Sequence, residues 1–311
     1  MRGSELLDKM ELADPAFVQA ADAPSKRRKR YARWGALAAC LCLAAGALVW
    51  GLSGADVNGS AGDCFAADHT PTAGADGVTI PPMEVTLSKS DNAAMDMIGF
   101  FIYQGRCYVQ SDWLYDAPDV VGRRLGTAAG LIDEWTPRDG YVELAGSVGG
   151  DFYAVKGFDP AFMLCMTDGD GVVQIYVCNT GITLKTGAEL YEERLHLAGN
   201  YAAVEYESRQ SWYYSEGDVG QLSDDAAVSD FVAALNGAEF LLWSDAVQAL
   251  GTDTGSVYDL EQYHLYFRMD NGMTVHLRLY EGGYVRYQGI LDVCVQLPQG
   301  EYDALLAALE K

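Results

Sequence analysis

Hydrophobic and polar residues alternate most regularly near the C-terminus of the chain. Every second residue is apolar over residues 263–269, and the same alternation follows over residues 273–279. A period of two is typical of β-strands with one buried face. A two-residue turn between the strands would mix the two faces, whereas a three-residue turn at 270–272, with its glycine left-handed, pairs Leu265 with Leu277. We therefore predict an antiparallel hairpin in the second register, which leaves one face wholly apolar.

Helical and strand patterns flank this hairpin on both sides. Polar residues at 223–225 precede apolar residues at helical spacing, and Asn236-Gly237 follows them, which predicts a helix between these points. Two further strands are expected at 284–288 and 293–297, followed by a final helix that carries Leu305, Leu306 and Leu309. The pattern predicts an α+β subdomain over residues 223–311, with one helix, an antiparallel meander and a closing helix on one face.

Shorter alternating runs, separated by turn residues, fill residues 77–222. Three hairpins are expected: residues 100–109 around Gln104-Gly105, residues 141–155 around Gly149-Gly150, and residues 163–178 around an acidic loop at 168–171. The acidic loop lacks the later glutamate of an EF-hand, so it is better explained as a turn than as a metal site. We therefore predict a β-rich subdomain over residues 77–222.

The longest apolar run lies near the N-terminus. Residues 34–52 carry no charge, and nineteen helical residues span roughly 28 Å, close to the thickness of the hydrocarbon core of a bilayer. A basic cluster precedes the run and acidic residues follow it, which places the N-terminus in the cytoplasm by the positive-inside rule. The residues expected at the membrane interfaces are Arg27, Arg28, Lys29, Arg30, Trp34 and Trp50. We predict a cytoplasmic tail at 1–33, a single transmembrane helix at 34–52 and an extracytoplasmic domain beyond it.

Two alternative interpretations of the apolar run involve cleavage. Leu37-Ala38-Ala39-Cys40 resembles the lipobox of a lipoprotein, but the apolar run continues past the cysteine. Ser53-Gly54-Ala55 resembles a signal-peptidase site after an unusually long basic region. An uncleaved signal-anchor is the interpretation favoured here.

The N-terminal tail carries two helix-start signals, at Ser4 and at Asp14-Pro15. The apolar residues that follow them, the candidate partner-binding residues of the tail, are Leu6, Leu7, Met10, Phe17 and Val18. Short isolated helices are marginal in water, so this apolar side is expected to dock on a cytoplasmic protein or to lie on the membrane surface. A spacer with transient helicity is the third interpretation.

Charge divides the chain unevenly. Residues 1–33 hold eight basic and five acidic side chains, whereas the rest holds 13 basic and 39 acidic ones, a net charge of −26 beside −23 overall. Such an acidic domain repels polyphosphates, which argues against nucleic-acid binding.

Between the membrane run and the β-rich part, residues 53–76 are rich in Gly, Ala, Ser and Asp and predict a flexible linker.

No catalytic, cofactor or metal motif is present in the sequence. There is no phosphate loop, no GxSxG and no HExxH. His264 and His276 are expected as surface residues on the polar side of the hairpin, with His264 facing Arg278 and no carboxylate in place to assist them. Asp133 and Glu134 are adjacent, which suits an acid/base pair poorly because neighbours on a strand point to opposite faces. No cofactor is therefore assigned.

Cysteine and aromatic residues complete the candidate chemistry. The seven cysteines lack metal-ligand spacing, and Cys107, Cys178 and Cys294 lie in alternating strands, which predicts mostly free, buried thiols. Tyrosine and tryptophan are abundant, notably at 212–214 and over 263–287. These rings suit the binding of a peptide, glycan or protein surface, and they are also ordinary strand formers.

Several segments of the chain resemble a known group of proteins. The tail ELLDKMELADPAF, the cluster KRRKR, the run WGALAACLCL, and the outer segments GLIDEWTP and DFYAVKGFDPAFMLC are similar to uncharacterised single-pass membrane-anchored proteins of gut Firmicutes. Some proteins of this kind are anti-sigma-factor-like, so the resemblance implies a sigma factor as a cytoplasmic partner. The zinc-binding His/Cys motif of many anti-sigma domains is absent, since no His or Cys precedes Cys40.

These observations together predict a non-enzymatic role. We expect a membrane-anchored extracytoplasmic sensing or interaction protein with an unidentified outer ligand, able to signal through its tail. The alternative is a cell-surface carbohydrate-binding module or hydrolase.

Overall fold

The computed structural model describes residues 70–83, 98–115, 117–132, 141–167, 171–253 and 256–310. These residues belong to one compact unit, Val49–Lys311. The predictions for the tail, the basic cluster, the run at 34–52 and the pair Asp133 and Glu134 lie outside the described residues. Within the described ranges, no helix is long and apolar enough to cross a membrane. The predicted α+β class, rich in strands with a few helices, is confirmed for this unit.

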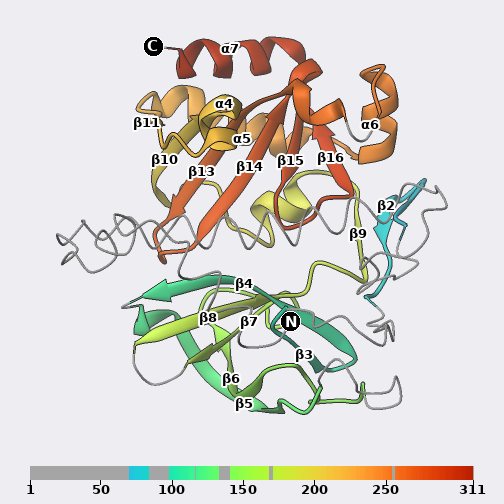
Figure 1. Ribbon diagram of the computed structural model, residues 1–311, viewed down its shortest axis with the longest axis vertical. Coiled ribbons are helices and arrows are strands. Elements are labelled where there is room, and N and C mark those ends of the chain that lie inside the picture. Colours follow the sequence, from blue (N-terminus) through green and yellow to red (C-terminus); the bar gives the residue numbers. More distant parts are fainter. Residues whose placement is uncertain are drawn as a thin grey trace, which may run out of the picture. The chain divides into compact units, whose positions relative to one another are not determined.

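A seven-stranded antiparallel sheet occupies the C-terminal part of the chain (Figure 1). Its strands, in spatial order, are β11 (Val219–Gln221), β10 (Tyr201–Ser208), β13 (Glu261–Met269), β14 (Thr274–Tyr280), β15 (Tyr284–Tyr287), β16 (Val293–Gln296) and β12 (Phe240–Leu242). Leu265 lies opposite Leu277, and the Gly272 N–H donates to the Met269 carbonyl in a turn where Gly272 has a φ of 88°. The predicted three-residue turn and its register are therefore confirmed.

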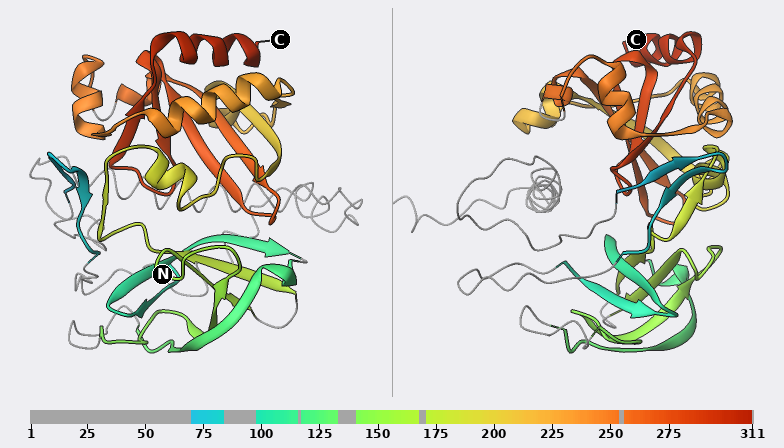
Figure 2. Two further views of the ribbon diagram at one scale, coloured as in Figure 1. Left: turned by 180° about the vertical axis from the view of Figure 1, so that it is seen from behind. Right: turned by 90° about the vertical axis from the view of Figure 1, so that its right-hand side faces the viewer.

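Helices lie on both faces of this sheet (Figure 2). Helices α5 (Asp225–Gly237) and α7 (Gln299–Leu309) pack on the apolar face, where Phe231 and Leu305 join the main hydrophobic core. The Asp224 side chain accepts a hydrogen bond from the Ala227 N–H and so begins α5. The predicted first and last helices of this part are confirmed.

The second face of the sheet is covered by shorter elements, α4 (Arg209–Tyr214), α6 (Trp243–Ala249) and the 3₁₀ turn η5 (Ser256–Leu260). The turn η6 (Glu281–Gly283) joins β14 to β15. In the side view of Figure 2, α4 and α5 lie on opposite sides of the sheet. The face that the alternation predicts as polar is therefore partly enclosed.

A six-stranded antiparallel sheet precedes the seven-stranded one in sequence. Its strands, in spatial order, are β3 (Phe100–Tyr103), β4 (Arg106–Tyr115), β8 (Val172–Val177), β7 (Met163–Thr167), β6 (Gly149–Val155) and β5 (Val121–Ala129), with the turn η2 (Pro118–Val120) before β5. The hairpins around Gln104-Gly105 and around the acidic loop are confirmed. The hairpin around Gly149-Gly150 is wrong, because both glycines lie inside β6, which pairs with β5 and β7.

Residues 141–148 take another role, because they bridge the two edges of the six-stranded sheet. The Leu144 N–H donates to the Ile102 carbonyl of β3, and the Leu144 carbonyl accepts from the Ala129 N–H of β5. Gly146 approaches β3 so closely that an added Cβ would lie 2.4 Å from the Phe100 carbonyl oxygen. The strongly curved sheet is thereby joined into a small barrel around Phe101, Phe152, Tyr176 and their neighbours (Figure 1).

A three-stranded sheet of β1 (Thr72–Gly74), β2 (Gly77–Ile80) and β9 (Ile182–Leu184) lies in the same unit. Strand β1 falls inside the predicted linker 53–76, so the ordered strands begin before its expected end, because Thr72–Gly74 pairs with β2. The π-helical turn η4 (Ala188–Glu192) follows β9. The predicted boundary at residue 222 falls within the seven-stranded sheet, since β10 and β11 precede it and β10 pairs with β13.

Candidate functional site

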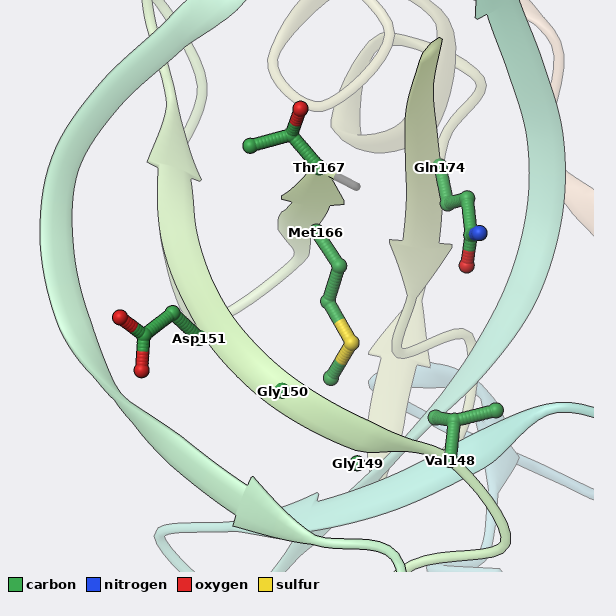
Figure 3. Close-up of a pocket in the computed structure, with 7 residues that line it drawn as sticks. All are labelled: Val148, Gly149, Gly150, Asp151, Met166, Thr167 and Gln174. Atoms are coloured by element: carbon green, nitrogen blue, oxygen red, sulfur yellow. The ribbon is translucent and has the colours of Figure 1, made fainter. Parts of the chain in front are cut away.

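The structure contains a pocket at the side of the barrel formed by β6, β7 and β8. Its volume is about 280 Å³, and its lining residues are Val148, Gly149, Gly150, Asp151, Met166, Thr167 and Gln174. Figure 3 shows the Met166 and Gln174 side chains extending from neighbouring strands toward the Val148–Gly150 segment, whereas the Asp151 carboxylate points away from them. The glycines leave backbone groups at the surface of the pocket, because they carry no side chain.

Polar groups hold the rim of this pocket in place. The Asp151 carboxylate accepts hydrogen bonds from Arg124 Nε and Nη2, each at 2.7 Å, and from the Thr127 hydroxyl. The hydrogen bonds from Arg124 lower the pKa of Asp151 to about 2, so it is ionised at neutral pH. The Tyr176 hydroxyl donates to Gln174 Oε1 at 2.7 Å, which fixes that amide. The pocket thus offers amide, hydroxyl and backbone groups of the kind that bind a small neutral polar ligand.

A second cluster lies on the enclosed face of the seven-stranded sheet. His264 Nδ1 lies 2.8 Å from His276 Nε2 across the β13–β14 hairpin, and His264 is 0% exposed. Glu261 Oε1 lies 3.4 Å from His264 Nε2, and Arg278 donates to both carboxylate oxygens of Glu261, with Nη2 at 2.8 Å from Oε2. The ring of Trp212 from α4 stacks on His264 at a centroid distance of 4.4 Å and an angle of 18°.

Charge and burial set the protonation of this cluster. Burial by itself raises the pKa of Glu261, but the hydrogen bonds and charges of Arg278 and His264 outweigh it and lower that pKa to about 2. The pKa of His276 lies well below its usual 6.5, because burial and the neighbouring His264 and Arg278 disfavour a further cation. The cluster therefore holds a carboxylate–guanidinium pair beside two coupled imidazoles.

The expectation that His264 and His276 are surface residues without a carboxylate is wrong. They form a hydrogen-bonded pair with Glu261 beside it, because α4 and η5 cover this face and the register brings Glu261 near the start of the same hairpin. The expected placement of His264 opposite Arg278 is confirmed. The proximity of Glu261 to His264 could have been inferred from the sequence, because the two are three residues apart. The burial of the pair could not, because the covering helix comes from residues 209–214, about fifty positions earlier.

The pair is not arranged as a metal centre. The two imidazole nitrogens that face each other are joined by one hydrogen bond, and no group of three or more His, Cys, Asp or Glu in the described ranges is placed to hold a metal ion.

Cysteines and aromatic residues are distributed as follows. Cys107, Cys165, Cys178 and Cys294 are buried free thiols, which confirms the prediction for the described part of the chain. Tyr213 and Tyr214 are exposed, at 63% and 67% of their surface, whereas Tyr280, Tyr284 and Tyr287 are buried. The aromatic side chains that were expected to form a binding surface are therefore largely packed inside the fold. The exposed tyrosines in the described ranges are Tyr213 and Tyr214 of α4 and Tyr115 of β4.

Comparison with known proteins returned no match among family models, curated proteins or solved structures.

Proposed function

We propose that this protein is a membrane-anchored sensing or interaction protein whose β-rich domain lies outside the cell and whose short tail signals inside. The observation that carries the proposal is the order of segments: a basic cluster, then nineteen uncharged residues at 34–52, then the acidic folded unit. The partners proposed are the lipid bilayer, an outer ligand, and a cytoplasmic protein such as a sigma factor. Nucleic acid is not among them, because the folded unit is strongly acidic.

The topology is tested by tagging the two ends of the chain and treating intact cells with protease. The proposal expects a tag after Lys311 to be digested and a tag before Met1 to be protected until the membrane is permeabilised. Digestion of both tags, or protection of both, would contradict the proposed orientation.

The tail is tested by capture from solubilised membranes. The full chain is compared with a Leu6→Ala/Leu7→Ala/Met10→Ala variant and with a matched polar variant, Glu5→Gln/Lys9→Gln, which keeps the apolar residues. The proposal expects a cytoplasmic protein, identified by mass spectrometry, to be captured by the wild type and the polar variant but not by the alanine variant. Equal capture by all three, or no cytoplasmic protein with any of them, would contradict signalling through the tail.

A carbohydrate-binding module is the second candidate, and the pocket beside β6 favours it. A fixed amide at Gln174 and exposed backbone at Gly149 and Gly150 suit the hydroxyl groups of a sugar. Glycan-array binding by the full chain, lost in Gln174→Ala but kept in Gln262→Ala on the other sheet, would support this candidate. Binding that is equal in both variants would contradict it.

A further inference from the structure

The His264–His276 contact has a chemical property that an ordinary buried polar pair lacks. A hydrogen bond between two imidazole nitrogens needs one donor and one acceptor, so the pair is satisfied with one proton between the facing nitrogens. One added proton gives a single imidazolium that can keep this hydrogen bond, whereas two added protons make both rings cations and both facing nitrogens donors 2.8 Å apart. The pair therefore becomes repulsive once both rings are protonated.

We propose that the His264–His276 pair is a proton-binding site through which acid outside the cell releases helix α4 from the sheet. The stimulus is the hydrogen ion, and the moving element is α4 with its following loop. That the acid is outside the cell rests on the proposed function, whereas the release of α4 concerns the folded unit alone.

Helix α4 is coupled to the pair through few contacts. Trp212 stacks on His264, and the Ser211 hydroxyl donates to the buried Glu207 carboxylate at 2.7 Å. The exposed side chains of Tyr213 and Tyr214 contribute little burial. A helix of six residues is unstable by itself, so α4 stays in place through these contacts with β10 and β13, together with the Arg209–Asp259 ion pair to η5 and the Arg278 guanidinium over the Trp212 ring. Loss of the Trp212 contact would weaken the attachment of α4 to β13.

The surroundings of the pair contain limited negative charge to compensate new protons. The Glu261 carboxylate lies 3.4 Å from His264 Nε2 but also accepts two hydrogen bonds from Arg278. Glu207 accepts from Ser211 and from the Tyr266 hydroxyl. The charged and titratable groups around the pair, by element, are Glu205 and Glu207 on β10, Arg209 on α4, Tyr258 and Asp259 on η5, Glu261, Tyr266 and Arg268 on β13, Arg278 and Tyr280 on β14, and Arg286 on β15. Arg278 and Arg268 disfavour a cation at His276, which adds to the repulsion.

The direction of the pH effect follows from linkage. The pKa of His276 is lower in the closed state than the value near 6.5 of an exposed histidine, so the open state binds the proton more readily. Closure of α4 is therefore favoured above that pH and is weakened as the pH falls below it, by at most about tenfold per pH unit for one histidine.

The test is amide hydrogen exchange on the full chain in detergent micelles, at about pH 7.5 and about pH 5, with correction for the intrinsic exchange rate. We expect the protection of residues 209–214 to fall by at least about tenfold at the lower pH, while that of α5 changes little. In His276→Gln, whose amide can still bond to His264, protection should be kept at both pH values. His196→Gln, at a histidine that precedes β10 in the sequence, should respond like the wild type.

Two results would overturn the proposal. One is an α4 protection that is independent of pH in the wild type, and the other is an equal acid response in His276→Gln. If His276→Gln does not fold, proton NMR of the wild-type histidines decides: independent titration of both rings near 6.5 with α4 unchanged contradicts the proposal. If acid releases α4 but the tail variants capture the same proteins as the wild type, this inference stands and the proposed signalling function fails. If capture depends on the tail but acid does not release α4, the proposed function stands and this inference fails.

Discussion

The guanidinium of Arg286 lies 4.1 Å from the centre of the Trp243 ring, on the enclosed face of the seven-stranded sheet. Arg286 also donates to the Leu291 carbonyl, and Trp243 packs against Tyr280 at the start of α6. A buried cation on an aromatic face is worth up to about 2 kcal/mol, in addition to the packing of the ring. This contact ties α6 to the sheet.

Replacement of Trp243 tests this contact. We expect Trp243→Leu to lower the free energy of unfolding by about 2–4 kcal/mol, because it removes the cation–π contact and leaves a partly filled cavity. The measurement is a urea titration followed by circular dichroism. Trp113→Leu, at a half-buried position on β4, is the control and should lose less than half as much; equal losses would contradict a special role for the contact.

The Glu261–Arg278 pair gives a second prediction. Glu261→Gln leaves the Arg278 charge buried without its carboxylate, so we expect a loss of about 3–5 kcal/mol in unfolding free energy. The double variant Glu261→Leu/Arg278→Met removes both charges and should recover most of this loss. A double variant as unstable as the single one would show that the cost comes from shape rather than from an unpaired charge.

The same pair predicts how stability responds to strong acid. Glu261 has a pKa of about 2 in the folded protein and of 4.5 when it is exposed to water, so its stabilisation is present above pH 4.5 and is lost as the pH falls toward 2. The expected loss over that window is about 3 kcal/mol. Urea titrations from pH 6 downward measure it, and the double variant should show a flatter profile below 4.5.

Two glycines provide a matched pair for the β13–β14 turn. Gly272 has a φ of 88°, so Gly272→Ala should destabilise the protein by about 1–2 kcal/mol. Gly237 ends α5 in open surroundings and has no positive φ, so Gly237→Ala should be neutral or stabilising by up to about 1 kcal/mol. Thermal unfolding of both variants measures the difference, and a tolerated Gly272→Ala would contradict the left-handed turn.

The buried thiols should be unreactive in the folded protein. Burial raises the pKa of Cys107, Cys165 and Cys294 to about 12, so little thiolate exists at neutral pH. In a Cys40→Ser/Cys42→Ser/Cys64→Ser background, we expect a disulfide reagent such as DTNB to label the protein only after urea is added. Rapid labelling of the native variant would mean that the strands carrying these thiols open readily.

Local patterns predicted the elements in which sequence neighbours decide the structure. The register from Leu265 to Leu277, the start of α5 at Asp224 and the turn at Gln104-Gly105 depend on alternation, capping and turn residues that lie within a few positions. Gly149-Gly150 misled the prediction because a glycine pair is typical of a turn, whereas here both glycines begin β6 and pair with Ala129 and Ala128 of β5.

The enclosed histidine pair could not be predicted in the same way. Alternation marks His264 and His276 as polar and cannot reveal that Trp212 covers them, because that contact joins residues 52 positions apart. The pocket at Gln174 likewise depends on the joining of β3 to β5 by an irregular segment. Both the histidine pair and the pocket at Gln174 therefore depend on contacts between residues far apart in the sequence, which local patterns do not reveal.

The bridge at 141–148 has a consequence for how the protein behaves at high concentration. A curved sheet with open edges would accept a strand from a neighbouring molecule and so begin aggregation. Here β3 is bonded on both sides, and the rest of β5 carries two register shifts and the exposed Arg123 and Arg124, which discourage strand addition. Copies of the protein that meet at high concentration would therefore stay separate at this sheet.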